Sequence, residues 1–224
     1  MKFAVQLKGS KPLLEQMAPG FQGEFVKINK IGDEWFLESS AFNTCQAPLE
    51  VFPIADEVLR LVHRIIAMYC QLFSPFEVGY VQSFTDDGSP GERGIRGVTR
   101  IQIYSATEVP ELQAISNGQS LGSKLVATAM SDKRLEEALN LIGDGVEFQW
   151  PQIYNVIEFL GGSSEIAKKK WATAEQIRKC RQTANHYRHL GSPKRYPLPI
   201  NPPSQGEATR FALTLLKRWI LSSI

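Results

Sequence analysis

The stretch "FVKINKIGDEWFLES", from Phe25 to Ser39, consists of two short runs rich in β-branched and aromatic residues, one on each side of Gly32-Asp33. A two-residue loop that begins with glycine is typical of a β-hairpin, because such a turn needs a positive φ. Apolar residues occupy alternate positions in both runs, so one face of the hairpin is expected to lie on a core. These core-facing residues are Val26, Ile28, Trp35 and Leu37.

The apolar pattern becomes helical from about Pro53 to Phe73. Apolar residues recur there at spacings of three and four, which predicts one long amphipathic helix. The stripe consists of Ile54, Val58, Leu61, Ile65, Tyr69 and Leu72. His63 lies opposite this stripe, near Arg60 and Arg64, and is predicted to be an ordinary surface histidine, because polar side chains are mostly exposed.

Residues 77–104 return to a strand pattern. "EVGYVQSF" at 77–84 and "GIRGVTRIQIY" at 94–104 are predicted strands, joined by the turn-rich stretch "TDDGSPGERG". The glycines of this region do not form a phosphate-binding loop, because neither GxxxxGK[ST] nor GxGxxG followed by a helix is present. Asp86 and Asp87 are expected to be turn formers rather than ligands of a divalent ion.

From about Pro110 to its end the chain is predicted to be helical. Ser131 is expected to cap a helix that stops at Gly143, and Pro151 to start another that ends at a double glycine. The first of these helices buries Leu135, Ala138, Leu139 and Ile142. Two capping boxes, in which the N-cap residue and the residue three positions later satisfy each other's backbone N–H groups, predict two more helix starts. They are Thr173 with Gln176 and Ser204 with Glu207.

Between these last two helices lies "LGSPKRYPLPINPP", residues 190–203, which contains five prolines. Such a segment cannot be helical and is predicted to be an extended surface connector. In the helix that follows, one side carries Ala208, Phe211, Leu215 and Trp219. We expect the protein's own core to cover this side, with Trp219 packed against the helix of residues 174–189.

Together these patterns predict an α+β fold, with N-terminal β hairpins, one long helix and a helical C-terminal part. The expected division is 1–110 and 111–224, either as two domains or as one continuous domain.

The composition is that of a soluble globular protein: of 224 residues, 43% are hydrophobic and 21% are charged. No apolar run reaches the roughly 18 residues that cross a bilayer. The first residues, "MKFAVQLKGSKPLLEQM", contain too short an apolar core for a signal peptide. We therefore expect a cytoplasmic protein that does not bind membranes.

The cysteines Cys45, Cys70 and Cys180 include no CxxC pair, so they indicate neither a zinc site nor a disulfide framework. No nucleophile elbow and no HExxH motif is present. His186 and His189 could form half of a metal site, but no carboxylate lies near them in the sequence. We predict neither a metal nor another cofactor.

Positive charge is concentrated near the C-terminus. Residues 176–206 contain no Asp or Glu and six Lys or Arg, which leaves 19 basic against 23 acidic residues in the rest of a chain whose net charge is +2. A basic segment on an acidic body is typical of a protein with an anionic partner.

On a helical wheel, residues 174–189 separate into two faces. The predicted core face consists of Ile177, Cys180, Ala184 and Tyr187, and the neighbouring polar face of Arg178, Arg181, Gln182, Asn185, Arg188 and His189; His186 points elsewhere. Guanidinium and amide groups at this spacing suit a phosphate, and histidine can exchange a proton near neutral pH. The alternative is a solvated helix face whose arginines pair with carboxylates from elsewhere in the fold.

The six residues "RQTANH" place Arg181 and His186 five positions apart on this helix. They resemble the signature of the HEPN superfamily of all-helical ribonucleases. The resemblance implies that this arginine and histidine meet at a dimer interface and cleave RNA without a metal. On one continuous helix the two residues lie about 140° apart, so a shared site needs a distortion or a second subunit. The β-rich first half departs from the fold of that superfamily.

A second resemblance covers "TANHYRHLG" and "EATRFALTLLKRWI". These segments look like the C-terminal end of uncharacterised bacterial proteins, in which "TAN" precedes an Arg-His pair. The residues that this resemblance implies are Thr183, Asn185, Arg188 and His189. The two resemblances select different histidines, and the assignment stays open between them.

We therefore predict a protein that binds a phosphate-bearing ligand, nucleic acid first. Arg178, Arg181 and Arg188 would hold phosphates and Asn185 would orient them, with further contacts from Gln182, Lys194 and Arg195. His186, His189 and Arg181 are the catalytic candidates if a reaction occurs. The alternatives are a metal-independent ribonuclease like the HEPN enzymes and a non-catalytic interaction module that packs on a partner or forms a homodimer.

Overall fold

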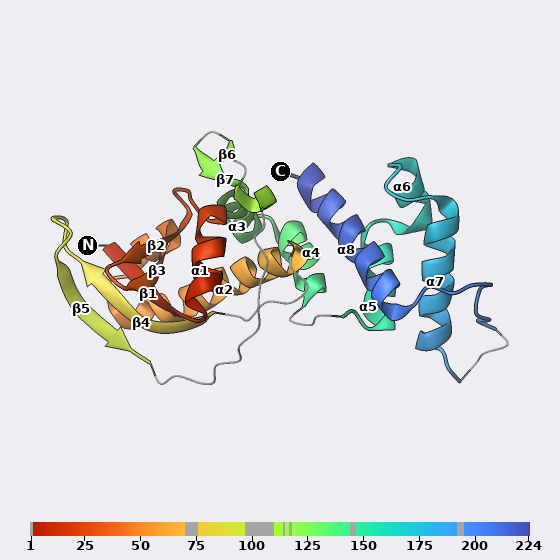
Figure 1. The fold of residues 1–224 in the computed structure, drawn as a ribbon, viewed down its shortest axis with the longest axis horizontal. Coiled ribbons are helices and arrows are strands. Elements are labelled where there is room, and N and C mark those ends of the chain that lie inside the picture. Colours follow the sequence, from red (N-terminus) through yellow and green to blue (C-terminus); the bar gives the residue numbers. More distant parts are fainter. Residues whose placement is uncertain are drawn as a thin grey trace. The chain divides into compact units, whose positions relative to one another are not determined.

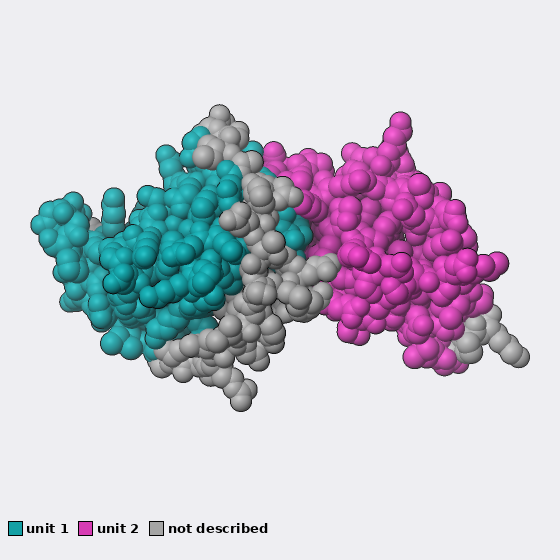
Figure 2. Space-filling view, in the orientation of Figure 1, with its two compact units in different colours: residues 1–133 teal, residues 134–224 magenta. Residues whose placement is uncertain are grey.

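The computed structural model describes residues 2–69, 76–96, 110–113, 115–116, 118–143, 147–191 and 195–224. These residues form an α+β fold, as predicted (Figure 1). The chain divides into two compact units, residues 1–133 and residues 134–224 (Figure 2). The division at residue 110 that the sequence suggests falls inside the first unit. None of the described helices is long and apolar enough to cross a membrane.

A five-stranded antiparallel sheet, in the order β2-β3-β1-β4-β5, forms the centre of the first unit. Its strands are β1 (Lys2–Lys8), β2 (Val26–Ile31), β3 (Glu34–Ser39), β4 (Glu77–Phe84) and β5 (Pro90–Ile95). The hairpin at Gly32-Asp33 is confirmed: Ile31 pairs with Glu34, and Gly32 has a φ of +61°. All four of its predicted core residues are buried.

Helices α2 (Pro48–Tyr69) and α3 (Leu121–Ser131) build the core with this sheet, since α2 packs on β4, β5 and α3 (Figure 1). The approach of β5 to the start of α2 is close, because a Cβ added at Gly94 would lie 2.7 Å from Pro48 Cβ. The remaining short elements are α1 (Lys11–Met17), β6 (Ile115–Ser116), β7 (Gln119–Ser120) and the 3-10 turns η1 (Ala18–Gly20), η2 (Ser40–Thr44) and η3 (Pro110–Gln113).

Two predicted boundaries in this unit are wrong. Helix α2 begins at Pro48 rather than Pro53, because a proline is well tolerated in the first turn and the added residues Val51 and Phe52 are buried. Strand β5 begins at Pro90, inside the stretch that the sequence assigns to a loop, and pairs with β4. Residues 97–104 of the predicted strand lie outside the described residues.

His63 is partly buried, which contradicts its prediction as a surface residue. The backbone N–H of Phe76 donates a hydrogen bond of 2.9 Å to His63 Nε2, and the two rings lie 5.7 Å apart. Burial lowers the pKa of His63 to about 4. The apolar periodicity of α2 could not show this contact, because Phe76 lies outside that helix, directly before β4.

Five helices lie wholly or mainly in the second unit: α4 (Lys133–Ile142), α5 (Trp150–Phe159), α6 (Gly162–Lys168), α7 (Ala174–Arg188) and α8 (Gln205–Ser222). Helix α5 packs against both α7 and α8 (Figure 1). Both capping boxes are present, and the four predicted core residues of α4 are buried. Ser131 does not cap α4, however, because it is the last residue of α3 and its hydroxyl donates to the carbonyls of Ala127 and Thr128.

The environment of Trp219 also differs from the prediction. Its ring is partly buried and meets the Phe159 ring of α5 edge-on at 5.3 Å, with the Arg134 guanidinium 5.4 Å from its centre. Helix α5 lies between α8 and α7. The most buried side of α8 is therefore shifted by about one residue position around the helix from the predicted stripe. That side includes Ala208, Ala212, Leu215, Leu216 and Ile220.

Candidate functional site

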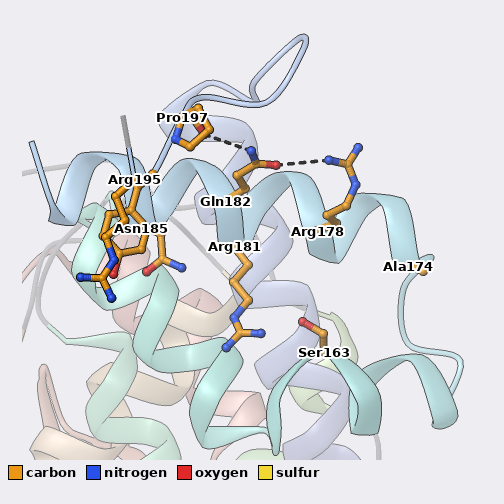
Figure 3. A pocket seen from close by; sticks show the side chains of 9 residues that line it. Ser163, Ala174, Arg178, Arg181, Gln182, Asn185, Arg195 and Pro197 are labelled. Atoms are coloured by element: carbon orange, nitrogen blue, oxygen red, sulfur yellow. Dashed lines mark hydrogen bonds between the residues drawn. The ribbon is translucent and has the colours of Figure 1, made fainter. Parts of the chain in front are cut away.

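A pocket of about 420 Å³ lies in the second unit, between α7, α6 and the proline-rich connector (Figure 3). Its lining residues are Ser163, Ala174, Arg178, Arg181, Gln182, Asn185, Arg195, Tyr196 and Pro197. Three of these are arginines, and none is a carboxylate. The pocket therefore gathers five of the predicted site residues, namely Arg178, Arg181, Gln182, Asn185 and Arg195. Lys194 lies outside the described residues.

The polar face of α7 is fixed by the burial of its opposite side. Ile177, Cys180 and Ala184 are buried as predicted, and so is Thr183, whose hydroxyl donates to the carbonyl of Lys179 at 2.8 Å. Tyr187 is not a core residue: it is 40% exposed and stacks on Trp150 of α5 at 4.9 Å. Because these four buried side chains anchor α7, the pocket residues are held at the rim of the pocket.

Two residues of α7 and the residue that follows it hold the connector, which forms one wall of the pocket. Gln182 Nε2 donates to the carbonyl of Pro197 at 3.0 Å (Figure 3). His186 Nδ1 lies 2.7 Å from the carbonyl of Tyr196; because a carbonyl only accepts, Nδ1 carries the proton. The His189 ring stacks on that of Tyr196 at 4.5 Å. Gln182, which the sequence predicts to contact a ligand, therefore also holds the connector in place.

Arg181 is the arginine of the pocket that is paired with a carboxylate. Its Nη2 lies 2.9 Å from Glu158 of α5. The pKa of Arg181 is raised above its usual value by a hydrogen bond with Tyr154, and then by the charge of Glu158. Its Nε is buried and has no hydrogen-bond partner among the described residues. An unpaired buried donor is costly, so a ligand acceptor at this nitrogen would be stabilising.

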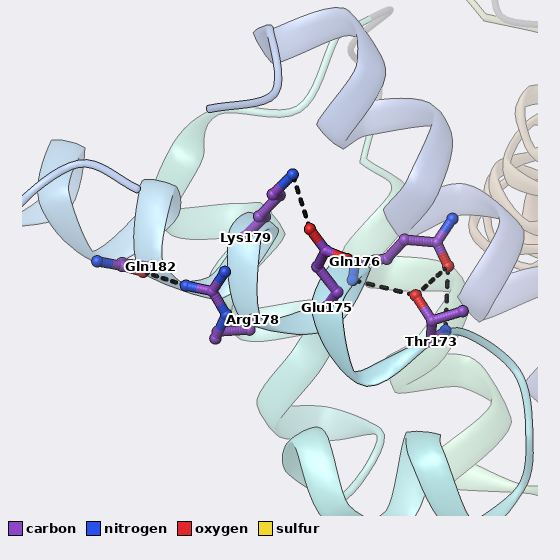
Figure 4. A network of polar contacts seen from close by, with 6 residues as sticks. All are labelled: Thr173, Glu175, Gln176, Arg178, Lys179 and Gln182. Atoms are coloured by element: carbon purple, nitrogen blue, oxygen red, sulfur yellow. Dashed lines mark hydrogen bonds and ion pairs between the residues drawn. The ribbon is translucent and has the colours of Figure 1, made fainter. Parts of the chain in front are cut away.

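Arg178, Arg188 and Arg195 form no ion pair with a carboxylate in the part of the chain that the structure describes. Arg178 donates to Gln182 Oε1 at 3.2 Å, while the neighbouring Lys179 pairs with Glu175 at 3.0 Å (Figure 4). The Arg188 guanidinium lies 4.0 Å from the centre of the Tyr154 ring. That of Arg195 lies 5.5 Å from the centre of the Tyr196 ring. Neutralisation by carboxylates is therefore partial: the charge of Arg178 helps to lower the pKa of Glu175, while Arg188 and Arg195 form no ion pair with a described carboxylate.

The two residues of the "RQTANH" motif have different neighbours. Helix α7 is continuous over residues 174–188. Arg181 forms an ion pair with Glu158, whereas His186 forms a hydrogen bond with the carbonyl of Tyr196. His189 follows the helix and accepts a hydrogen bond of 3.2 Å from Arg188 Nε at its own Nε2.

Sequence reasoning missed the contributions of α5 and α6. Tyr154, Glu158 and Ser163 surround Arg181 or line the pocket, yet they lie in the two helices before α7 and belong to no motif. The aromatic residues Trp150, Tyr154 and Tyr187 could have indicated this contribution in the sequence, because arginines often lie over aromatic rings.

The thiol of Cys180 is buried in this unit. Burial raises the pKa of the Cys180 thiol to about 11, which keeps the thiol protonated and unreactive at neutral pH. Within the described residues, no group of three His, Cys, Asp or Glu side chains is placed to hold a metal ion.

Comparison of the chain with protein-family models, with curated protein sequences and with solved structures finds no match in any of the three.

Proposed function

We propose that the pocket on α7 binds a phosphate-bearing ligand, with nucleic acid as the first candidate. The observation that carries the proposal is the lining of this pocket, which combines three arginines with two side-chain amides and includes no carboxylate among the described residues. Its volume of about 420 Å³ falls within the usual range for ligand pockets. Guanidinium groups and amides together supply the planar and neutral donors that phosphate oxygens accept.

The state of the arginines supports this function further. Arg178, Arg188 and Arg195 form no ion pair with a described carboxylate, so their charge is available to a ligand. Arg181 is held by Glu158 but keeps a buried Nε without a partner. We infer that Arg178, Arg188 and Arg195 contact phosphates and that Arg181 and Asn185 orient the bound group.

Replacing Arg178, Arg188 and Arg195 together with glutamine should weaken the binding of single-stranded RNA and flatten its dependence on salt. Each neutralised phosphate of a single strand contributes about 0.7 to the slope of log K against log salt concentration, so the slope should fall by about 2. Fluorescence anisotropy of a labelled oligonucleotide, measured from about 50 to 200 mM salt, gives both values.

The matched control removes the same charge from the first unit. Lys2, Lys27 and Lys30 are exposed residues of β1 and β2, and their replacement with glutamine should leave the slope nearly unchanged. An equal loss of slope in both variants would mean that binding follows net charge, and the pocket would then have no special role.

A further inference from the structure

A second cavity of the same unit, of about 600 Å³, lies between α8 and the turn that joins α6 to α7. The rings of Trp171 and Phe211, both partly buried, supply its apolar surface. Lys170, Arg210 and Arg218 bring three positive charges to the same cavity, and none of the described residues that line it is a carboxylate. This combination of flat rings and cations is distinct from the pocket on the other side of α7, which has no residue in common with it.

We call this cavity the groove. Its cations, Lys170, Arg210 and Arg218, are available to a ligand. No ion pair links Lys170, Arg210 or Arg218 to a carboxylate among the residues that the structure describes. Arg218 Nη1 donates to the carbonyl of Trp171, which ties α8 to the turn and leaves the rest of the guanidinium group exposed. Glu207, the nearest acid along α8, accepts two hydrogen bonds from Ser204 at Oε2, and the charge of Arg210 helps to lower its pKa, so Glu207 offsets part of the charge of Arg210.

Gln176 adds a neutral donor to the groove. Its Oε1 accepts hydrogen bonds from the backbone N–H and the hydroxyl of Thr173, as the capping box requires (Figure 4). Its amide nitrogen is directed away from these contacts and has no partner among the described residues (Figure 4). The N–H groups of this amide can therefore donate to a bound oxygen.

Lys170 occupies a backbone position that favours glycine. It has a φ of +57°, its N–H donates to the carbonyl of Ala167, and the N–H of Trp171 donates to that of Ile166. This pair of hydrogen bonds closes α6 as a Schellman motif, in which glycine or asparagine is usual at the left-handed residue. A lysine there has no advantage for the turn, and it adds a positive charge to the groove.

We propose that this groove binds a nucleotide unit, with the base on the Trp171 ring and the phosphate among Lys170, Arg210 and the Gln176 amide. Base stacking on an aromatic ring and charge-assisted hydrogen bonds to phosphate are the two interactions that this set of residues provides. The nucleotide is either free or the terminal unit of a nucleic-acid strand. Nucleotide binding in the groove does not require that the α7 pocket has the function proposed for it.

The test is isothermal titration calorimetry with AMP and with ribose 5-phosphate, which carries the same phosphate and no base. AMP should bind at least about tenfold more tightly, because stacking of one base contributes roughly a factor of ten or more. Replacing Trp171 with leucine should remove this difference. Equal affinity of the wild-type protein for the two compounds, or no binding of AMP, would overturn the proposal.

The variant Lys170→Gly separates binding from folding. Glycine suits the left-handed backbone, so the melting temperature should not fall, while the affinity for AMP should fall about tenfold through the loss of a charged contact. Lys169→Gly, at the exposed neighbouring position, should leave AMP binding unchanged. If AMP binding survives in Lys170→Gly/Arg210→Gln and disappears in Arg178→Gln/Arg195→Gln, the nucleotide occupies the α7 pocket and the proposal is wrong.

A competition experiment distinguishes the two sources of the nucleotide. A 5′-phosphorylated single-stranded oligoadenylate that displaces AMP from the Arg178→Gln/Arg195→Gln variant identifies a strand end as a ligand of the groove. Failure of the oligonucleotide to displace AMP there restricts the groove to free nucleotides.

Discussion

A chain that ends at Pro203, and so lacks α8, is expected to lose the folded state of its second unit. Helix α8 buries Ala208, Thr209, Ala212, Leu213, Leu215, Leu216 and Ile220. Each large aliphatic side chain contributes about 1.5–3 kcal/mol when fully buried. The sum over this helix is comparable with the roughly 5–10 kcal/mol that stabilises a unit of this size. Deletion of α8 therefore removes as much free energy as the unit has.

The deletion also removes polar contacts that close the start of α5. Thr209 Oγ1 accepts a hydrogen bond of 3.1 Å from the N–H of Phe148, and Gln205 Nε2 donates to the Phe148 carbonyl at 3.1 Å. Without α8 the buried N–H of Phe148 would lose its partner, at a cost of about 1–3 kcal/mol. Circular dichroism and thermal unfolding should show the loss of helical signal, and size-exclusion chromatography should show expansion of the chain.

Two leucines of α8 provide a matched pair for the same conclusion. Leu216 is fully buried, and its replacement with alanine should lower the free energy of unfolding by about 2–5 kcal/mol. Leu221 is 40% exposed, and the same replacement there should have little effect. A truncated protein that keeps its thermal stability but changes its oligomeric size would contradict this account and would make α8 an assembly element.

Local signals in the sequence predicted local structure well. The turn at Gly32-Asp33 needs a positive φ that glycine adopts, and each capping box satisfies backbone groups within four residues. Such devices act between neighbours in the chain, so the residues that form them can be read directly. The amphipathic character of α7 follows from the same kind of pattern, and its three most buried predicted residues are confirmed.

The errors concern contacts between distant segments. Trp219 meets Phe159 of α5 instead of α7, because the packing order of three helices is not encoded in any one of them. Similarly, the sequence identifies Arg181 as a site residue but cannot show that Glu158 neutralises part of its charge. The polar face of α7 could be predicted from the sequence of that one helix. Which of its arginines are free to bind a ligand could not, because that depends on the side chains of α5 and the connector that lie beside each arginine.

His63 illustrates the same limit and leads to a prediction about pH. Its imidazole is buried beside Phe76, and its pKa is about 4, below the value of about 6.5 that histidine has in an unfolded chain. The folded protein therefore binds this proton less readily than the unfolded chain does. Protonation favours unfolding, so the stability that the neutral ring allows is complete above pH 6.5 and is lost as the pH falls towards 4.

Over that window the wild-type protein should lose about 3 kcal/mol of stability through His63 alone. The variant His63→Gln removes the titrating group, and its side-chain oxygen can accept the hydrogen bond from the Phe76 N–H in place of Nε2. Denaturant unfolding of both proteins at several values between pH 7 and pH 4 measures the difference. Carboxyl groups such as Glu207 and Asp87, whose pKa values are lowered by hydrogen bonds to Ser204 and Thr85, contribute equally to both proteins and cancel in the comparison.

The size of this effect distinguishes a ring held neutral inside the first unit from one that reaches water. A ring in contact with solvent would protonate near pH 6.5 in both folded and unfolded chains, and the two proteins would then lose stability in parallel. Parallel curves would thus contradict the buried position of His63. We expect the stability curves of the two proteins to diverge below pH 6.5. Between pH 7 and pH 4 the wild-type protein should lose more free energy of unfolding than the His63→Gln variant loses. They would place the Phe76 contact among the interactions that hold α2 to the segment leading into β4.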